Sequence, residues 1–154
     1  MRPQEFIDQI APAAIACMKA TGIPASFTLA QAALESSWGA SKLALEGHNL
    51  FGVKADRSWT GDILMMETRE VFNGKSVMVN ARWRKYPTWQ ACIDDRAHFF
   101  ADNPRYKDCF HETTGEGWAY AAKRAGYATD PAYAEKLIAV MRGRSMSRFD
   151  VVKP

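Results

Sequence analysis

The chain has 154 residues, of which 47% are hydrophobic and 24% are charged, and its formal net charge is +3. This balance is typical of a folded globular protein rather than a disordered or fibrous one, and the length suits a single domain over residues 1–154. A mildly basic chain meets anionic polymers readily. Because long basic runs and nucleic-acid motifs are absent from the sequence, we expect a partner other than nucleic acid.

Several classes of site and location are also disfavoured. The N-terminus lacks the apolar core and cleavage site of a signal peptide, and no window reaches the length of a membrane span. The three cysteines are odd in number and their spacing does not suggest a disulfide, so we expect them to be small core side chains. The histidines are scattered and no glycine-rich phosphate loop occurs, so we expect neither a metal nor a cofactor.

The N-terminal third predicts helices. Residues 3–21 place apolar side chains on one helical face, and a Gly and a Pro follow that segment. Ser26 is a suitable N-cap for a second helix that continues through Glu35 toward Trp38. A short helix over residues 40–45 is expected next.

The segment 59–86 changes character and predicts a small β-lobe. An Asn-Gly pair at 73–74 lies between two candidate strands, which is a strong signal for a hairpin turn. After the turn, the side chains from Val77 to Trp83 alternate with period two, which predicts a strand with one buried face. A two-residue turn would place Glu70 opposite Val77.

Helical patterns return after the hairpin, over about residues 87–103, 116–124 and 131–141. The polar tail over residues 143–154 is expected to be loose. The predicted fold is therefore α+β but mostly α, with a helical lobe and a small hairpin lobe. A cleft between the two lobes is the natural place for a site.

One carboxylate is unusual for its surroundings. Glu35 lies among alanine and leucine, and helical spacing predicts that it shares a face with Gln31, Trp38 and Gly39. A carboxyl group beside an indole loses water, which favours its neutral form and makes it a proton donor near neutral pH. The alternative interpretation is a partly exposed helical glutamate without chemistry.

A second carboxylate is needed if the chemistry is glycoside cleavage. That reaction requires a proton for the leaving oxygen and a nucleophile or an activated water on the other side. The hairpin offers Asp62, Glu67 and Glu70. Pleating puts Glu67 and Glu70 on opposite faces, and only one face can look into a cleft. The spacing alone leaves this choice open.

Four sequence blocks resemble, in the same order, those of glycoside hydrolase family 73, the peptidoglycan β-N-acetylglucosaminidases that include flagellum-associated wall hydrolases. The blocks are LAQAALESSWG at 29–39, NLFGVKA at 49–55, WRKY at 83–86 and GYATDPAYA at 126–134. The third block has Trp where the family has Phe. The resemblance covers about residues 6–141 and implies a lysozyme-like fold.

The resemblance also implies roles for individual residues. It implies that Glu35 is the general acid, and it selects Glu70 over Glu67 because Glu70 stands in a Glu-x-x-Asn-Gly context at the hairpin tip. It implies that Tyr127 holds water or the substrate N-acetyl group. If the hairpin kept Glu70 too far away, the substrate's own acetamido oxygen would act as the nucleophile.

Six further residues are candidates for contact with sugar; the alternative role is in the core for Trp38, Phe51 and Trp83, and the cap of a turn for Asn49. These candidate binding residues are Trp38, Asn49, Phe51, Trp83, Tyr86 and Tyr133.

From these observations we expect a peptidoglycan hydrolase that cleaves the β-1,4 bond after N-acetylglucosamine. It would act as a monomer on the glycan strand, without membrane insertion. The expected setting is a leaderless phage or prophage endolysin, made in the cytoplasm and released through a holin to the wall or periplasm. The alternative setting is a bacterial enzyme exported within a longer chain. The alternative functions are a lytic transglycosylase or muramidase of the lysozyme superfamily, and a non-catalytic wall-binding or flagellar assembly module.

Overall fold

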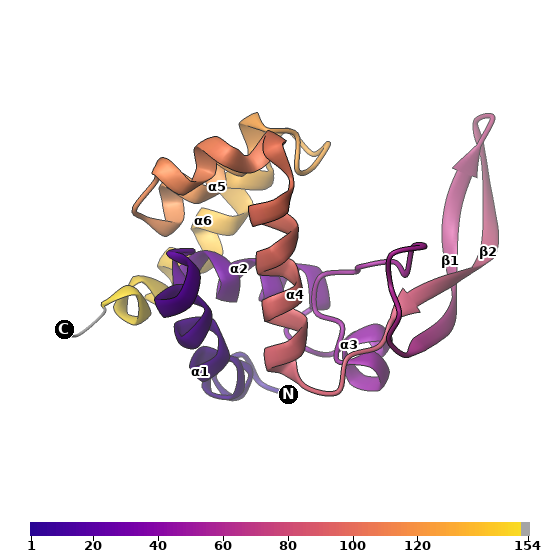
Figure 1. Ribbon diagram of the computed structural model, residues 1–154, viewed down its shortest axis with the longest axis horizontal. Helices are drawn as coiled ribbons and strands as arrows, with labels where there is room; N and C mark the ends of the chain where they lie inside the picture. Colours follow the sequence, from indigo (N-terminus) through magenta and orange to yellow (C-terminus); the bar gives the residue numbers. More distant parts are fainter. Residues whose placement is uncertain (152–154) are drawn as a thin grey trace.

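The computed structural model describes residues 1–151 and shows a helical body with one β-hairpin standing beside it (Figure 1). The predicted mostly helical α+β architecture is confirmed. The α-helices are α1 (Pro3–Thr21), α2 (Ala25–Ser36), α3 (Lys42–Gly47), α4 (Trp89–Asp102), α5 (Gly115–Arg124) and α6 (Tyr133–Gly143). The strands are β1 (Ile63–Phe72) and β2 (Lys75–Arg84), and the 3-10 helices are η1 (Pro104–His111) and η2 (Met146–Asp150).

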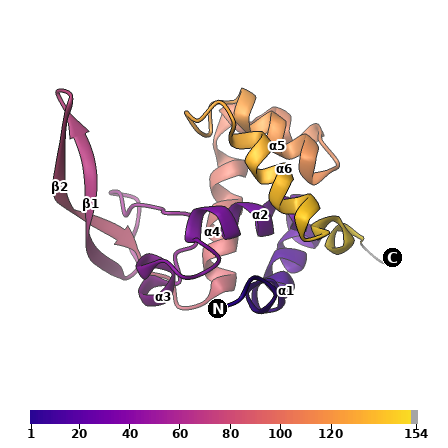
Figure 2. The same ribbon diagram turned by 180° about the vertical axis from the view of Figure 1, so that it is seen from behind.

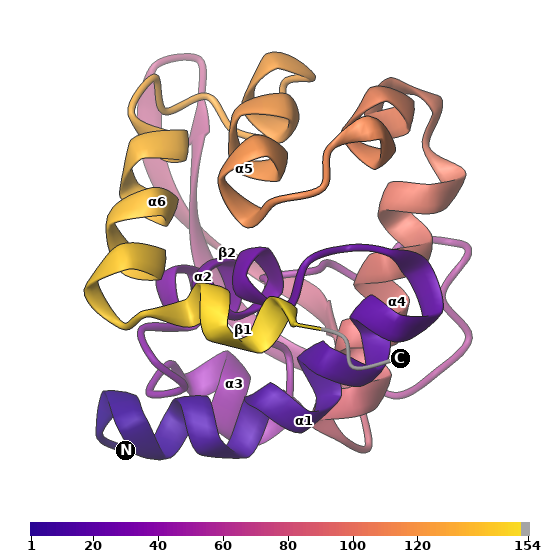
Figure 3. The same cartoon turned by 90° about the vertical axis from the view of Figure 1, so that its left-hand side faces the viewer.

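Helix α2 lies at the centre of the helical body, with α1, α4, α5 and α6 arranged around it (Figure 3). Ten of its twelve residues are buried, as expected for a helix that is apolar nearly all round. Phe27 packs against Phe100 and Trp118, with ring centroids 5.9 and 5.4 Å away. Glu35, in the last turn, is exposed, so α2 brings this residue from the core to the surface.

The end of α2 differs from the prediction. The helix stops at Ser36, because Ser37 and Trp38 adopt left-handed backbone with φ of 52° and 58°. Since the helix does not continue, the prediction that Trp38 shares a helical face with Glu35 is wrong. The Trp38 ring instead packs edge-on against Phe6, with centroids 5.8 Å apart.

The start of α2 and the C-terminal segment also correct the predictions. Ser26 lies inside the first turn of α2 rather than at the N-cap, and its backbone N and its Oγ donate to the Asp150 carboxylate at 2.8 and 2.6 Å. Asp150 thus supplies an acceptor to a helix N-terminus. Because Met146 is also fully buried, the segment 146–150 is packed rather than loose. Residues 152–154 of the expected tail lie outside the described residues.

The hairpin has the predicted register. Glu70 pairs with Val77 across an antiparallel ladder, and Asn73 and Gly74 take the positive φ values that a two-residue turn requires. The predicted buried face is realised only near the base, because Val77, toward the tip, is 38% exposed. Glu70 lies on the less exposed face and Glu67 on the exposed face.

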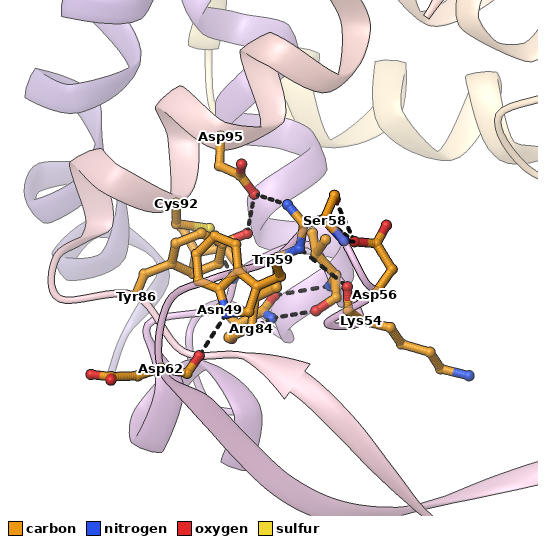
Figure 4. Close-up of polar contacts among 12 residues, drawn as sticks. Asn49, Lys54, Asp56, Ser58, Trp59, Asp62, Arg84, Tyr86, Cys92 and Asp95 are labelled. Atoms are coloured by element: carbon orange, nitrogen blue, oxygen red, sulfur yellow. Dashed lines mark hydrogen bonds and ion pairs between the residues drawn. The ribbon is translucent and has the colours of Figure 1, made fainter. Parts of the chain in front are cut away.

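A cluster of side chains anchors the base of the hairpin to α4 (Figure 4). The Arg84 guanidinium donates to the Asp95 carboxylate at 2.7 Å and lies 4.9 Å from the centre of the Trp59 ring. The Tyr86 hydroxyl donates to the same carboxylate at 2.5 Å. The base is therefore held against the helical body, whereas the tip projects away from it (Figure 2).

Candidate active site

Glu35 is held at the boundary between core and solvent. Although the residue is exposed, its Oε1 accepts a hydrogen bond from the Tyr133 hydroxyl of α6 at 2.9 Å. Partial desolvation of the carboxyl raises the pKa of Glu35, and the hydrogen bond from Tyr133 acts in the opposite direction. The shift has the predicted direction, toward a carboxyl that retains its proton to higher pH.

Tyr133 connects this carboxyl to the interior. The phenol is buried, and its oxygen accepts a hydrogen bond from Gln31 Nε2 at 3.0 Å. Burial, followed by the nearby Glu35 charge, raises the pKa of Tyr133, so its hydroxyl remains a donor. The sequence predicts that Tyr133 contacts sugar, and in the structure its hydroxyl donates to Glu35.

Tyr127 lies beside Tyr133. Its ring stacks between Phe100 and Tyr133, with centroids 5.6 and 5.7 Å away. Burial raises the pKa of Tyr127 to about 12, and the Glu35 charge contributes in the same direction. Among the described residues its hydroxyl has no hydrogen-bond partner. Tyr127 is thus close to the carboxyl and has a hydroxyl free for a ligand.

A cavity of about 740 Å³ adjoins Tyr127. It lies between the loop over residues 51–58 and the end of α4 with η1, and its lining includes Phe51, Val53, His98, Phe99 and Asn103. Glu35 is not among the lining residues, and Tyr127 is the lining residue on which the Glu35 charge acts. Its size is that of an ordinary ligand site.

Glu70 lies in the other lobe. Its carboxylate accepts from Lys54 Nζ at 2.5 Å, and the same ammonium lies 5.7 Å from the centre of the Trp83 ring. Lys54 belongs to the loop that pairs with β2 through an isolated bridge to Trp83. The hairpin therefore presents Glu70 on its inward face, held by a cation that the sequence analysis did not identify.

Three predicted binding residues are occupied by structural contacts. Asn49, 1% exposed, donates through Nδ2 to the carbonyls of Val53 and Arg84, both at 2.9 Å. The Tyr86 hydroxyl is committed to Asp95, and the Trp83 indole donates to a β1 carbonyl at 3.3 Å. These contacts favour the structural alternative for Asn49, give the Tyr86 hydroxyl a structural partner in Asp95, and leave only the ring face of Trp83 for a sugar.

The remaining two candidates border charged groups. Phe51 lines the cavity and lies 4.7 Å from the Arg96 guanidinium. Trp38, half-buried, has the Arg144 guanidinium 5.6 Å above its ring. Of the two, only Phe51 lies where a ligand in the cavity would touch it.

Sequence reasoning missed Arg96, which is 2% exposed and donates from Nε to Gln31 Oε1 at 2.6 Å. A signal was present, because Arg96 interrupts the apolar stripe of α4. The buried residues of that stripe are Cys92, Ile93, Ala97 and Phe100.

Residues 1–151 show neither metal-binding nor membrane-spanning features. Those residues contain no cluster of three or more potential metal ligands. None of their helices is both long and apolar enough to cross a bilayer. The three cysteines are buried and free, in agreement with a core role.

Comparison with known proteins covers nearly the whole chain. The family model described as mannosyl-glycoprotein endo-beta-N-acetylglucosaminidase matches residues 11–145. The peptidoglycan hydrolase FlgJ of Vibrio parahaemolyticus is 39% identical over 142 residues, which are 90% of this chain and 46% of the relative. The exo-glucosaminidase LytG of Bacillus subtilis is 37% identical over 98% of this chain and 55% of the relative. The chain spans about half the length of these curated relatives.

Solved structures agree with the sequence relatives. A glycoside hydrolase domain of FlgJ from Salmonella typhimurium superposes with a TM-score of 0.81 at 34% identity, covering 94% of this chain and 98% of that one. The catalytic domain of the autolysin Auto from Listeria monocytogenes gives 0.88 at 31% identity, covering 96% and 87%. The predicted lysozyme-like fold is confirmed by these similarities.

Proposed function

This chain belongs to the glucosaminidase family of glycoside hydrolases, and on that premise we propose that it hydrolyses the β-1,4 bond after N-acetylglucosamine in bacterial peptidoglycan. The names of its relatives, peptidoglycan hydrolase and exo-glucosaminidase, support this substrate. The observation that carries the proposal is Glu35, a carboxyl with a raised pKa and a tyrosine hydrogen bond on one oxygen.

In the proposed mechanism, Glu35 enters the reaction protonated and transfers its proton to the leaving glycosidic oxygen. General acid catalysis needs a group that is still protonated at the working pH, which the raised pKa of Glu35 favours. As the bond breaks, positive charge develops on the sugar ring. For Tyr127, whose ring stacks on Tyr133, the proposed role is to contact the N-acetyl group or the incoming water.

Two groups are candidates for stabilising the opposite side of the sugar. Retaining glycosidases place two carboxyl groups about 5–5.5 Å apart, and inverting ones about 6.5–9.5 Å apart. Glu70 is on the inward face of the hairpin and fulfils either role if substrate draws the hairpin tip toward Glu35. If the tip stays apart, the substrate acetamido oxygen takes this role.

The decisive experiment identifies the sugar at each new chain end. Purified peptidoglycan would be digested with the protein, and the soluble products analysed by mass spectrometry. The proposal predicts reducing N-acetylglucosamine ends. Anhydro-muramic ends would indicate a lytic transglycosylase, reducing muramic ends a muramidase, and the absence of products a wall-binding module.

For the biological setting we propose a phage or prophage endolysin that acts as a monomer at the wall. Expression in a bacterial host with a co-expressed holin should then cause lysis, whereas expression without the holin should not. Lysis without the holin would favour the alternative, a bacterial wall enzyme with its own route of export.

A further inference from the structure

Arg96 is a buried cation that pairs with no carboxylate of residues 1–151. Its guanidinium lies 4.7–5.0 Å from the ring centres of Phe27, Phe51 and Phe100. Its hydrogen bonds go to Gln31 and to Thr28 Oγ1, the latter at 3.1 Å, and its Nη2 has no partner among the described residues. Burying such a charge is unfavourable unless the surroundings compensate it, so its presence calls for an explanation beyond packing.

Three hydrogen bonds link this cation to Glu35. Arg96 Nε donates to Gln31 Oε1 at 2.6 Å, Gln31 Nε2 donates to the Tyr133 hydroxyl at 3.0 Å, and that hydroxyl donates to Glu35 Oε1 at 2.9 Å. This series of hydrogen bonds runs from α4 to α2, from α2 to α6, and from α6 back to the last turn of α2. We refer to Arg96, Gln31, Tyr133 and Glu35 as the relay.

The direction of every donor in the relay follows from Arg96. A guanidinium can only donate, so the Gln31 amide must turn its oxygen toward Arg96 and its NH₂ toward Tyr133. The Tyr133 oxygen then accepts from Gln31, and its single proton must point at Glu35 Oε1. In a protonated carboxyl the carbonyl oxygen is a better acceptor than the hydroxyl oxygen, so the Tyr133 donor on Oε1 favours the form with the proton on Oε2.

We propose that Arg96 is a positioning residue that acts through Gln31 and Tyr133 to keep the acidic proton of Glu35 on Oε2. This inference rests on the proposed role of Glu35 as general acid. Oε2 is the oxygen that Tyr133 does not occupy, and it is therefore the oxygen that can reach a glycosidic bond. The relay makes Oε1 of Glu35 an acceptor and leaves Oε2 to carry the proton.

The isosteric change Gln31→Glu reverses the relay. A carboxylate at position 31 would pair with Arg96 and also accept the Tyr133 proton, because it has no donor of its own. Glu35 would then turn its own proton toward the Tyr133 oxygen, away from substrate. Since the variant gives the buried Arg96 a counterion, we expect a melting temperature no lower than that of the parent.

The matched control is Thr28→Val. It removes the other Arg96 hydrogen bond but leaves the relay intact. We expect this variant to have the parental kcat and KM, whatever its effect on the melting temperature. Gln31→Glu should lower kcat on a soluble glycan oligomer by about tenfold or more with little change in KM.

The titration of Glu35 gives a readout that does not depend on turnover. The ionisable groups around it are Tyr133 of α6, Tyr127 of the preceding loop and, through its charge on both tyrosines, Arg96 of α4. Gln31→Glu removes the donor from Oε1 and adds a negative charge nearby. The ¹³Cδ titration of Glu35 should therefore shift to higher pH in this variant and stay unchanged in Thr28→Val.

The outcomes separate this inference from the proposed function. A parent protein that cleaves no glycan would refute the function, while the Glu35 titration would still report on the relay. The relay is overturned if Gln31→Glu keeps the parental kcat and Glu35 titration, or if Thr28→Val loses as much activity. If Gln31→Glu does not fold, Arg96→Lys, which keeps a donor-only group, should retain more of the parental kcat than Arg96→Met. Equal losses in these two variants would also overturn it.

Discussion

The two candidate carboxylates, Glu35 and Glu70, are held by different kinds of structure. Glu35 lies in the last turn of a helix that is buried on nearly every side, and its acceptor oxygen is linked by hydrogen bonds to a buried arginine. Glu70 lies on a two-stranded ribbon and pairs with Lys54, whose side chain is 53% exposed. The first arrangement holds one carboxyl oxygen as the acceptor of a hydrogen bond from a buried tyrosine. The second holds a charge loosely on an element that stands apart from the core.

This difference teaches where each part of the chemistry resides. A two-stranded ribbon is only marginally stable by itself, so its tip depends on whatever it contacts. A carboxyl that must carry a proton at a defined oxygen needs rigid surroundings, which the helical lobe supplies. Under the proposed function, proton transfer belongs to the helical lobe and an adjustable contact with substrate to the hairpin.

The largest effect is expected at the helical carboxylate. Glu35→Gln keeps the shape and removes the acidic proton, so the rate of glycan cleavage should fall by about 10²–10⁴-fold. The rate of reducing-end release measures this, with the melting temperature as a check on folding. A folded variant that retained most of the parental rate would remove Glu35 from the mechanism.

Packing of the helical lobe is tested next, by comparing two helical glycines. A Cβ at Gly115 would overlap Ser26 Oγ and lie 3.0 Å from Met141 Sδ, whereas a Cβ at Gly143 meets nothing within 4 Å. Gly115→Ala should therefore lower the free energy of unfolding by about 1–3 kcal/mol. Gly143→Ala should leave it unchanged or slightly higher, since alanine favours a helix.

Denaturant titration of both glycine variants measures the difference. If the two variants were equally stable, the Ser26 side chain and its contact with Asp150 would have to move aside for the new methyl group at little cost, unlike a close-packed core.

The hairpin carboxylate is tested by the pair Glu70→Gln and Glu67→Gln, which alter opposite faces of β1. If Glu70 acts across the sugar from Glu35, its variant should lose about tenfold in kcat, while Glu67→Gln should stay within about twofold of the parent. Initial rates on the same oligomer decide this. Parental rates from both variants would leave the acetamido group as the nucleophile.

The smallest effect is expected for the ion pair itself. Because Lys54 and Glu70 are partly exposed, their coupling in a double-mutant cycle of unfolding should be about 0–1 kcal/mol and should weaken with salt. The cycle would use Lys54→Met and Glu70→Gln. A larger, salt-independent coupling would mean that the hairpin is held as firmly as the helical lobe.

Local signals allowed much of this to be predicted. The Asn-Gly turn determined the register that places Glu70 opposite Val77, because a two-residue turn leaves one pairing. The alanine-rich run identified α2 and the position of Glu35 near its end. Both features depend on residues close together in the chain.

Features that depend on distant contacts were missed. The early end of α2 relies on left-handed backbone at Ser37 and Trp38, which their side chains do not favour. The packed C-terminal segment depends on Asp150 meeting a helix N-terminus 124 residues earlier in the chain. The relay was missed because Arg96 and Gln31 are 65 residues apart, although an arginine on an apolar stripe indicated an unusual environment.

The most direct test compares the pH dependence of kcat with the titration of Glu35. Because its pKa is raised in the folded protein and the acid must be protonated, kcat should be full below that pKa and lost as the pH rises through it. We predict that this limb coincides with the ¹³C titration of Glu35 in the substrate complex, above the usual range for a glutamate. A Glu35 that titrates at or below that range, or a kcat that increases through its pKa, would contradict the assignment of Glu35 as the proton donor.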